Sequence, residues 1–382
     1  MSAFIRYDRR NMKILIAPDK FKNTLTALQV GNAISKGIKA IDKNVDIEIC
    51  PLADGGEGSV DAIRHHLNLN DVDLQTIDAI GRPIFSNYYV FEKSAYIELA
   101  SSSGLYLIEQ NKRDILNAST RGTGKVIRHA IDNGATEIYL FVGGSATNDG
   151  GMGILYELGV HFYDKSGDEL LPSGKNMGLI YQIDRSVLFT SLSKIKFTIL
   201  VDVKNPFYGK NGAAHIFGKQ KGASPNQIQL LNLALMNFAA NIALTCYIDI
   251  QNVTGAGAAG GVAGGMYGIL NAKIENGIDF ISKILDLESK IKDADIVISG
   301  EGRLDHQSLQ GKVITGVCKI CKFYDRPLIL MVGENKLTDE IYAQDIYAIM
   351  EYAQDVNDAM QNASLYLEGF GCGLEIKKYK KT

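Results

Sequence analysis

Five glycine-rich loops hold the residues of this sequence whose types and spacing could do chemistry. Glycine lets backbone N–H groups approach an anion, and a helix that starts after such a loop favours negative charge at its N-terminus. Carboxylates are useful beside a phosphate where Mg²⁺ bridges them, because Mg²⁺ prefers oxygen ligands. Each loop follows an apolar run, and four of the five contain acidic residues: 17–23, 53–58, 143–151, 255–261 and 299–306. Together they favour a site for phosphate and a metal ion.

Familiar sequence templates for other chemistries fit poorly. Gly124-Lys125 and Gly311-Lys312 both lack the upstream glycine and the following Ser or Thr of a P-loop, which excludes that class. Gly255-x-Gly257-x-x-Gly260 matches the dinucleotide fingerprint, but its glycines continue to Gly268, as in a helix packed closely against its neighbours. Histidine spacing for zinc and the G-x-S-x-G elbow of hydrolases are missing from the sequence.

The composition is that of a globular chain with a surplus of glycine. The 382 residues include 39 glycines, and 40 basic residues nearly balance 43 acidic ones. This balance gives no reason to expect nucleic acid or a membrane surface as a partner. Five scattered cysteines argue against a disulfide framework. Cys318 and Cys321 form a lone C-x-x-C, and we expect them to be two apolar residues one helical turn apart. The uncharged stretch 255–272 is too weakly hydrophobic for a membrane span, so we expect a cytoplasmic protein.

Strand and helix patterns alternate at both ends of the chain. Near the N-terminus, the apolar run 13–17 precedes a helical pattern that Thr24 or Thr26 can cap. The middle of the chain differs, because 76–99 alternates as antiparallel hairpins do, and 225–247 has the pattern of a long amphipathic helix. Further strands are expected at 46–50, 137–142, 196–202, 295–299, 327–332 and 346–350. The repeated β-α-β order favours a parallel sheet covered on its faces.

The sequence therefore predicts an α/β fold of two domains. One is a parallel-sheet α/β domain that combines residues 12–75, 118–155 and 288–382. A mixed α/β domain formed by residues 76–117 and 156–287 is inserted into it. Residues 1–11 are expected to be an N-terminal extension, since the first strand begins directly after them.

Taken in order, the loops resemble those of the bacterial glycerate kinase family that lacks a P-loop. The matching motifs are Ala17-Pro-Asp-x-Phe-Lys22, Pro51-Leu-Ala-Asp-Gly-Gly-Glu-Gly58, Glu98-Leu-Ala-x-x-x-Gly-Leu105, Gly143-Gly-Ser-Ala-Thr-x-Asp-Gly-Gly151, Asp202-Val-x-Asn-Pro206, Gln220-Lys-Gly-Ala223, Gly255-Ala-Gly-Ala-Ala-Gly-Gly261 and Gly300-Glu-Gly-x-x-Asp-x-Gln307 with Gly311-Lys312. They extend from about residue 12 to beyond 330. The chain departs from the family pattern at Asn23, usually glycine, and at Arg121, Val201 and Lys219.

The resemblance implies a flavodoxin- or Rossmann-like domain paired with a second α/β domain, with the active-site cleft between them. It also implies ATP-dependent phosphorylation of glycerate with Mg²⁺, and it favours 2-phosphoglycerate over 3-phosphoglycerate as the product. On this reading Asp202 accepts the proton of the substrate hydroxyl, and Glu301 and Asp305 hold the metal. Lys22, Asp54 and Glu57 complete the expected catalytic residues. Phosphate would be bound by Gly143, Gly144, Ser145, Thr147, Lys221 and Lys312. We take the expected substrate to be D-glycerate.

Other interpretations of the same residues remain open. Asp54 and Asp149 could simply cap helices through turn hydrogen bonds, and Lys221 could be a solvated lysine. The fingerprint at Gly255 would suit an NAD-dependent dehydrogenase of a small hydroxy acid. A non-catalytic protein that binds small anions would use the same loops. The sequence leaves a homo-oligomer open.

Overall fold

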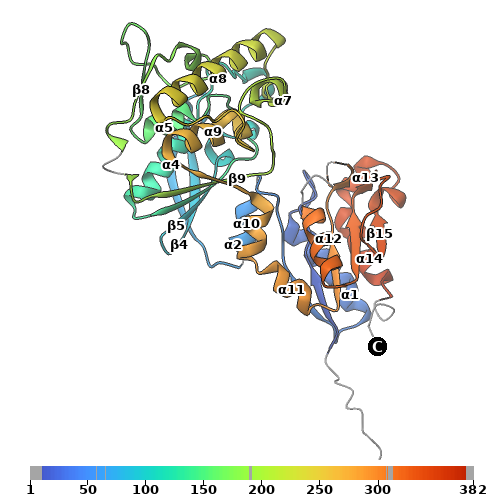
Figure 1. Cartoon of the computed structure of the whole chain (residues 1–382). Helices are drawn as coiled ribbons and strands as arrows, with labels where there is room; N and C mark the ends of the chain where they lie inside the picture. The colour runs from blue at the N-terminus through green and yellow to red at the C-terminus, as the bar shows by residue number, and fades with distance from the viewer. Residues whose placement is uncertain are drawn as a thin grey trace, which may run out of the picture. The chain divides into compact units, whose positions relative to one another are not determined.

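The protein forms two compact units, as seen in a computed structural model that describes residues 11–56, 58–64, 66–188, 192–306, 308 and 313–375 (Figure 1). Unit 1 joins Met1–Asp54 to Ile281–Thr382, and unit 2 is Gly55–Phe280. Two predicted site residues, Glu57 and Lys312, lie outside the described residues, as do residues 1–10 of the predicted extension.

Unit 1 contains a parallel five-stranded sheet. Its strands lie in the order β15 (Asp345–Ala348), β13 (Leu328–Val332), β11 (Ile296–Ser299), β1 (Lys13–Ile16) and β2 (Asp46–Ile49). Chain order therefore reverses between β1 and β11, which is where open parallel sheets bind ligands at the carboxyl ends of their strands. A short parallel pair, β12 (Arg303–Leu304) and β14 (Glu334–Asn335), follows from β11 and β13.

Helices lie on both faces of this sheet because the buried strands are apolar on both sides. Ile14 and Ile16 share a core with the buried faces of α1 (Ala27–Ile41) and α14 (Ala363–Gly373). Leu15 is also buried and points to the opposite face. The remaining helices of unit 1 are α11 (Leu287–Asp293), α12 (Val313–Phe323), α13 (Val356–Gln361) and the 3₁₀ turn η5 (Ile349–Glu351), with α11 and α12 against β1 and β11.

Two local predictions in unit 1 are confirmed. Thr26 caps α1 through a capping box, in which its hydroxyl accepts from the N–H of Gln29 and the Gln29 side chain accepts from the Thr26 N–H. Cys318 and Cys321 are free thiols buried in α12. Burial raises the pKa of Cys318 to about 12, so this C-x-x-C has no reactive thiolate at neutral pH.

Unit 2 is built on a mixed six-stranded sheet. Four strands are parallel to one another, and the last two join as an antiparallel meander, as the alternating pattern of 76–99 predicted. The order is β10 (Lys273–Asn276), β9 (Lys196–Val201), β6 (Glu137–Phe141), β5 (Ser94–Glu98), β4 (Pro83–Phe91) and β3 (Asn70–Ile77). Two reversals separate β5 from β3, so β9, β6, β5 and β3 all end at the same edge of the sheet.

The helices of unit 2 surround one large core. They are α2 (Ser59–Arg64), α3 (Ala100–Ser103), α4 (Arg121–Asp132), α5 (Met152–Glu157), α7 (Ala213–Phe217), α8 (Pro225–Cys246), α9 (Ala258–Leu270) and α10 (Gly277–Ile284), with 3₁₀ turns η1 (Leu105–Leu107), η2 (Gln110–Lys112), η3 (Asn176–Leu179) and η4 (Lys219–Lys221) and the hairpin β7 (His161–Tyr163) with β8 (Gln182–Asp184). The apolar side chains of α4, α5, α8 and α9 meet those of β5, β6 and β9 in this core.

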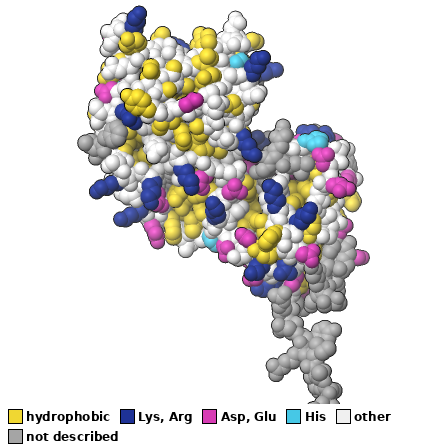
Figure 2. Space-filling view, viewed as in Figure 1, with side chains coloured by type: hydrophobic (Ala, Val, Ile, Leu, Met, Phe, Trp, Pro, Cys, Tyr) yellow, Lys and Arg dark blue, Asp and Glu magenta, His cyan; other side chains and the backbone are white. Residues whose placement is uncertain are grey.

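Among the described residues, α8 is the one helix whose length and composition would allow it to cross a membrane. Its inner face carries Leu235 and Phe238, both fully buried in the core of unit 2. Leu233 and Leu244 on the outer face are 62% and 76% exposed, and Figure 2 shows hydrophobic side chains on the surface over this helix. The helix is thus one wall of a packed core.

The domain boundaries differ from the predicted ones. Residues 118–155 were expected in the parallel domain of unit 1, but their strand β6 pairs with β5 and β9 in unit 2. Residues 55–75 likewise belong to unit 2, where β3 pairs with β4. The run Glu137–Phe141 is apolar enough for any buried parallel strand, so its own sequence cannot indicate which sheet it joins.

The glycine run 255–268 packs closely against neighbouring backbone, as predicted, and does not form a dinucleotide-binding loop. Ala259, Gly260 and Gly261 form a left-handed turn within α9. A Cβ atom on Gly260 would collide with the Thr147 carbonyl, and one on Gly265 with the Gly150 carbonyl. The backbones also bond directly, since the Gly150 N–H donates to the Gly260 carbonyl at 3.0 Å. The motif that could have supported a dehydrogenase is used in packing.

Replacing Gly265 by alanine should destabilise the protein by about 1–3 kcal/mol or more, because the new methyl group overlaps the Gly150 carbonyl. Gly369 in α14 is the matched control, since a Cβ atom there meets nothing within 4 Å. Gly369→Ala should be neutral or slightly stabilising, because alanine favours the helix. Urea denaturation measures both free energies of unfolding, and equal values for the two variants would contradict the packing account.

Candidate functional site

The loop that follows β6 is anchored along one side by backbone hydrogen bonds. The Leu105 N–H donates to the Gly144 carbonyl, and the Ala146 N–H donates to the Ser103 carbonyl, both at 2.8 Å. Gly144 adopts a φ of +72°, which glycine tolerates and other residues rarely do. Gly144 is exposed and Gly143 is half-buried, whereas Ser145 to Asp149 are buried. The first two glycines thus present their backbone to solvent at the carboxyl edge of the sheet.

Lys221 holds this loop from inside. Its side chain is buried, and its ammonium Nζ donates to the Ser145 hydroxyl and to the Thr147 carbonyl, both at 2.7 Å. Burial lowers the pKa of Lys221 to about 7, although the charge of Asp149 opposes this shift. The alternative of a solvated lysine is therefore wrong. The structure brings Gly143, Gly144, Ser145, Thr147 and Lys221 together, with the lysine behind the loop.

Asp149 links the N-termini of α4 and α5 to the same loop. Its carboxylate accepts from the Thr120 N–H at 2.7 Å and from the Thr120 hydroxyl at 2.9 Å, beside the start of α4. It also accepts from the N–H groups of Gly151 and Gly153 at 3.2 Å, at the start of α5. Burial raises the pKa of Asp149 despite these bonds. This is the helix-capping role that the sequence left open for Asp149.

Buried polar atoms without partners lie in the second half of the loop. Among the described residues, the Thr147 hydroxyl and both polar atoms of the Asn148 side chain are buried and make no hydrogen bond. Such atoms are uncommon in folded proteins, because each costs about 1–3 kcal/mol. They mark this end of the loop as a place where a bound polar group would be stabilised.

Asp202 lies directly after β9 and is exposed. It therefore ends its strand at the same sheet edge as the 143–149 loop. The sequence singled it out because a carboxylate that closes an apolar strand is costly when buried. In the structure its side chain is exposed, so that cost does not arise. Its candidacy now depends on its place at the edge and on the resemblance.

Unit 1 gathers several carboxylates at the carboxyl ends of β1, β2 and β11. The loops there are bonded together, since the Asp19 N–H donates to the Gly300 carbonyl and the Leu52 N–H to the Pro18 carbonyl, both at 2.8 Å. These bonds bring Asp19, Asp54 and Glu301 into one neighbourhood, in which each negative charge acts on Asp19. The site lies at the point where chain order reverses between β1 and β11.

Asp19 is a site residue that the sequence reasoning missed. It is 9% exposed, and burial raises its pKa to about 7, with Asp54 adding to the shift. Functional sites often contain a carboxyl group whose pKa is raised by burial and by neighbouring charges. The signal was present in the sequence, because Asp19 lies in the motif Ala17-Pro-Asp-x-Phe-Lys22 directly after an apolar strand.

The other predicted residues of unit 1 lie around this cluster. Lys22 is exposed. Asn23, where the family usually has glycine, adopts a φ of +62°, a conformation that asparagine tolerates better than most residues. Asp305 is half-buried and lies 3.6 Å from the Arg303 guanidinium, measured from Oδ2 to Nε. The described residues contain no group of three or more His, Cys, Asp or Glu arranged to hold a metal ion.

Asp19→Asn should stabilise the protein, and by more at pH 8 than at pH 5. The folded pKa of about 7 lies above the ordinary value of 3.8, so wild-type stability falls as pH rises from about 4 to 7. Asparagine cannot ionise and escapes this loss, which amounts to a few kcal/mol at most, on the order of 1.4 kcal/mol per pKa unit. Thermal denaturation in metal-free buffer measures the difference.

The exposed Asp46 provides the control, because Asp46→Asn should show no such dependence on pH. A stability difference between wild type and Asp19→Asn that stays constant from pH 5 to pH 8 would contradict the raised pKa of Asp19.

Comparison with known proteins places the whole chain among glycerate kinases. The model of the Glycerate kinase family matches residues 14–372. Glycerate kinase of Bacillus subtilis (strain 168) is 37% identical over 363 residues, which are 94% of this chain and 95% of that protein. Glycerate 2-kinase of Escherichia coli (strain K12) is 40% identical over 332 residues, 86% of this chain and 87% of that protein. A crystal structure named for glycerate kinase 2 of Salmonella typhimurium LT2 matches with a TM-score of 0.84 and 36% identity, covering 96% of this chain and 98% of that one.

Proposed function

The chain belongs to the glycerate kinase family, and we propose that it transfers the γ-phosphoryl group of ATP to the 2-hydroxyl of D-glycerate, which yields 2-phosphoglycerate and ADP. The observation that carries the proposal is the 143–149 loop, whose exposed Gly144 and half-buried Gly143 follow a parallel strand and whose buried half is fixed by Lys221. The 2-position is favoured because a relative that is 40% identical is named glycerate 2-kinase.

In this proposal the loop binds phosphate mainly through its backbone. Gly143 and Gly144 lie at the strand edge, where N–H groups can approach phosphate oxygens without a side chain in the way. The Ser145 hydroxyl already accepts a bond from Lys221, which leaves its own proton for donation to an anion. Thr147 has a buried hydroxyl without a partner among the described residues. Lys221 acts on the phosphate through the loop that it holds.

We assign Asp202 as the group that orients the substrate hydroxyl and accepts its proton. Phosphoryl transfer depends mostly on positioning and on neutralising charge, so the acceptor takes the proton late and need not be a strong base. An exposed carboxylate at the edge of the sheet is accessible to glycerate. Asp54 and Glu57 are proposed to hold hydroxyl groups of the substrate, and Lys22 and Lys312 to neutralise its carboxylate or the moving phosphoryl group.

The carboxylates of unit 1 fit Mg²⁺. Asp19, Asp54 and Glu301 supply only oxygen donors, and backbone hydrogen bonds join the loops that carry them. We propose Glu301 and Asp305 as the residues that hold the ion, and Asp19 as a carboxylate near Glu301. Mg²⁺ is commonly bound by one or two carboxylates together with substrate phosphates, so a complete three-residue cluster, which the described residues do not contain, is not required. When bound, the ion neutralises charge on the phosphates.

Asp202→Asn should lower kcat by about 10²–10⁴-fold, because asparagine cannot accept the proton of the substrate hydroxyl, and the change in stability should be small because the side chain is exposed. ATP consumption with D-glycerate and Mg²⁺ measures the rate, and phosphorus NMR identifies which hydroxyl carries the product phosphate. The exposed Asp168 of unit 2 is the control, and Asp168→Asn should behave as wild type.

Two outcomes would count against the proposal. Asp202→Asn at near wild-type kcat would remove its role as proton acceptor. A product with its phosphate on the 3-hydroxyl, or wild-type protein that consumes no ATP with glycerate, would overturn the proposed reaction.

A further inference from the structure

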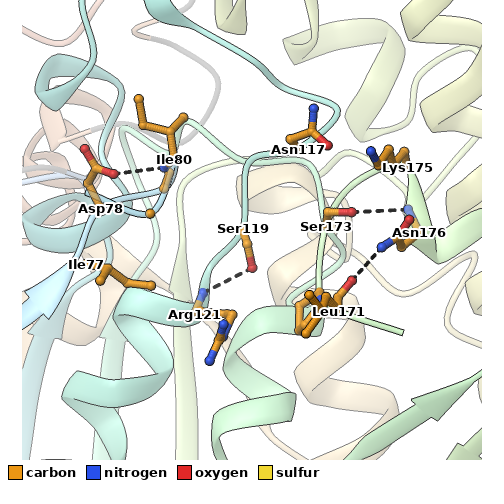
Figure 3. Close-up of a pocket in the computed structure, with 13 residues that line it drawn as sticks. Ile77, Asp78, Ile80, Asn117, Ser119, Arg121, Leu171, Ser173, Lys175 and Asn176 are labelled. Atoms are coloured by element: carbon orange, nitrogen blue, oxygen red, sulfur yellow. Dashed lines mark hydrogen bonds between the residues drawn. The ribbon is translucent and has the colours of Figure 1, made fainter. Parts of the chain in front are cut away.

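A pocket of about 340 Å³ lies within unit 2 and is not explained by the residues assigned so far. Three segments line it: the turn after β3 at 77–81, the approach to α4 at 117–121, and residues 171–176. Figure 3 shows Ile77, Asp78 and Ile80 on one side, Leu171, Ser173, Lys175 and Asn176 on the other, and Ser119 and Arg121 between them. Its volume lies at the small end of the range for small-molecule sites.

The pocket and the 143–149 loop share their supporting residues. Ala79 from the pocket wall packs with Ala118 and with Ala146 of the loop in one small apolar cluster. The Ser119 hydroxyl lies 3.4 Å from the Asp149 carboxylate, and Gly174 packs against the Asn148 carbonyl. The turn at 78–81 also follows β3, which ends at the same sheet edge as β6. The pocket therefore adjoins the buried half of the loop.

The walls of the pocket are fixed by their own hydrogen bonds. Asp78 accepts from the N–H of Ile80 at 3.0 Å and from Nε of Arg82 at 2.6 Å, which sets the turn and neutralises the aspartate. On the other side, the Asn176 side chain donates to the Leu171 carbonyl at 2.8 Å. These bonds hold the pocket in shape before any ligand binds, which lowers the entropic cost of binding.

The lining combines apolar surface with a positive charge. Leu171 is 63% exposed although it is a large apolar side chain, and it lines the pocket from a different segment than Ile80 (Figure 3). The Arg121 guanidinium is paired with Glu157 at 2.8 Å, and Asp78 with Arg82, so Lys175 contributes the remaining charge. Hydroxyl and amide groups of Asn117, Ser119 and Ser173 add donors and acceptors. This set suits an aromatic ring, a sugar and a neighbouring negative group.

We propose that this pocket binds the nucleoside end of the phosphoryl donor, with the base between Ile80 and Leu171 and the phosphates directed to the 143–149 loop. The inference rests on the proposed function and deepens it by assigning a place to the base and ribose. A pocket of this size holds a nucleoside but not a whole nucleoside triphosphate. The phosphates would therefore lie outside it, along the sheet edge.

The test uses Leu171→Gln, with Ile80→Gln as a second variant. Leu233 on α8 is 62% exposed and matches Leu171 in type and exposure, so Leu233→Gln is the control. Calorimetry measures the binding of ADP, adenosine and inorganic tripolyphosphate to the full chain. Both pocket variants should bind ADP and adenosine roughly five- to tenfold more weakly than wild type, and tripolyphosphate equally well. The control should match wild type for all three ligands.

Steady-state kinetics gives an independent measurement. KM for ATP should rise by a similar factor in both variants, while kcat and KM for glycerate stay within about twofold of wild type. Unchanged ADP binding in both variants, or an equal loss for tripolyphosphate, would overturn the pocket assignment. That result is distinguishable from failure of the proposed function, because the latter requires that wild-type protein consume no ATP with glycerate.

Discussion

In unit 2 the backbone at Gly150 and the backbone of α9 contact each other so closely that there is no room for a Cβ atom. The arrangement of the 143–149 loop depends on this contact. The Gly150 N–H donates to the Gly260 carbonyl, and Gly265 packs directly on the Gly150 carbonyl. The left-handed turn of α9 presents this surface. Because the loop cannot move toward α9, its free face is the one at the carboxyl edge of the sheet. The surplus of glycine in the sequence thus includes a close-packing contact that shapes a candidate site.

Buried charges complete this support and distinguish the two units. In unit 2, Lys221 and Asp149 are both buried, and each uses its hydrogen bonds on the loop or on the helix starts beside it. Burial lowers the pKa of the lysine and raises that of the aspartate. Keeping either side chain charged in the interior therefore costs free energy, which its hydrogen bonds partly offset. In unit 1 the buried Asp19 lies near Asp54 and Glu301, and the opposing effects of the Lys20 charge and N–H do not prevent the rise in its pKa. In our proposal, the 143–149 loop of unit 2 binds an anion, and the carboxylates of unit 1 supply oxygen donors to a cation.

Local features of the fold could be predicted from sequence, and long-range pairings could not. The capping box at Thr26 and the packing role of the run 255–268 follow from short stretches of chain. The sheet joined by β6 depends on partners some 40 residues before it and 60 after it, and a buried apolar strand carries no signal for that choice. For the same reason the burial of Lys221 and Asp19 could not be read, since it comes from loops distant in the sequence. The motifs indicated which loops to consider, and the burial and contacts of the residues within them came only from the structure.

The central claim is that Gly143 and Gly144 bind the phosphates of the nucleotide through their backbone N–H groups. Amide NMR of ¹⁵N-labelled protein tests it most directly, with a non-hydrolysable ATP analogue added in the presence of Mg²⁺. The account predicts large shifts of the Gly143 and Gly144 amide signals with the analogue and with tripolyphosphate, and small ones with adenosine. Saturating binding of the analogue that leaves both amide signals in place would contradict it.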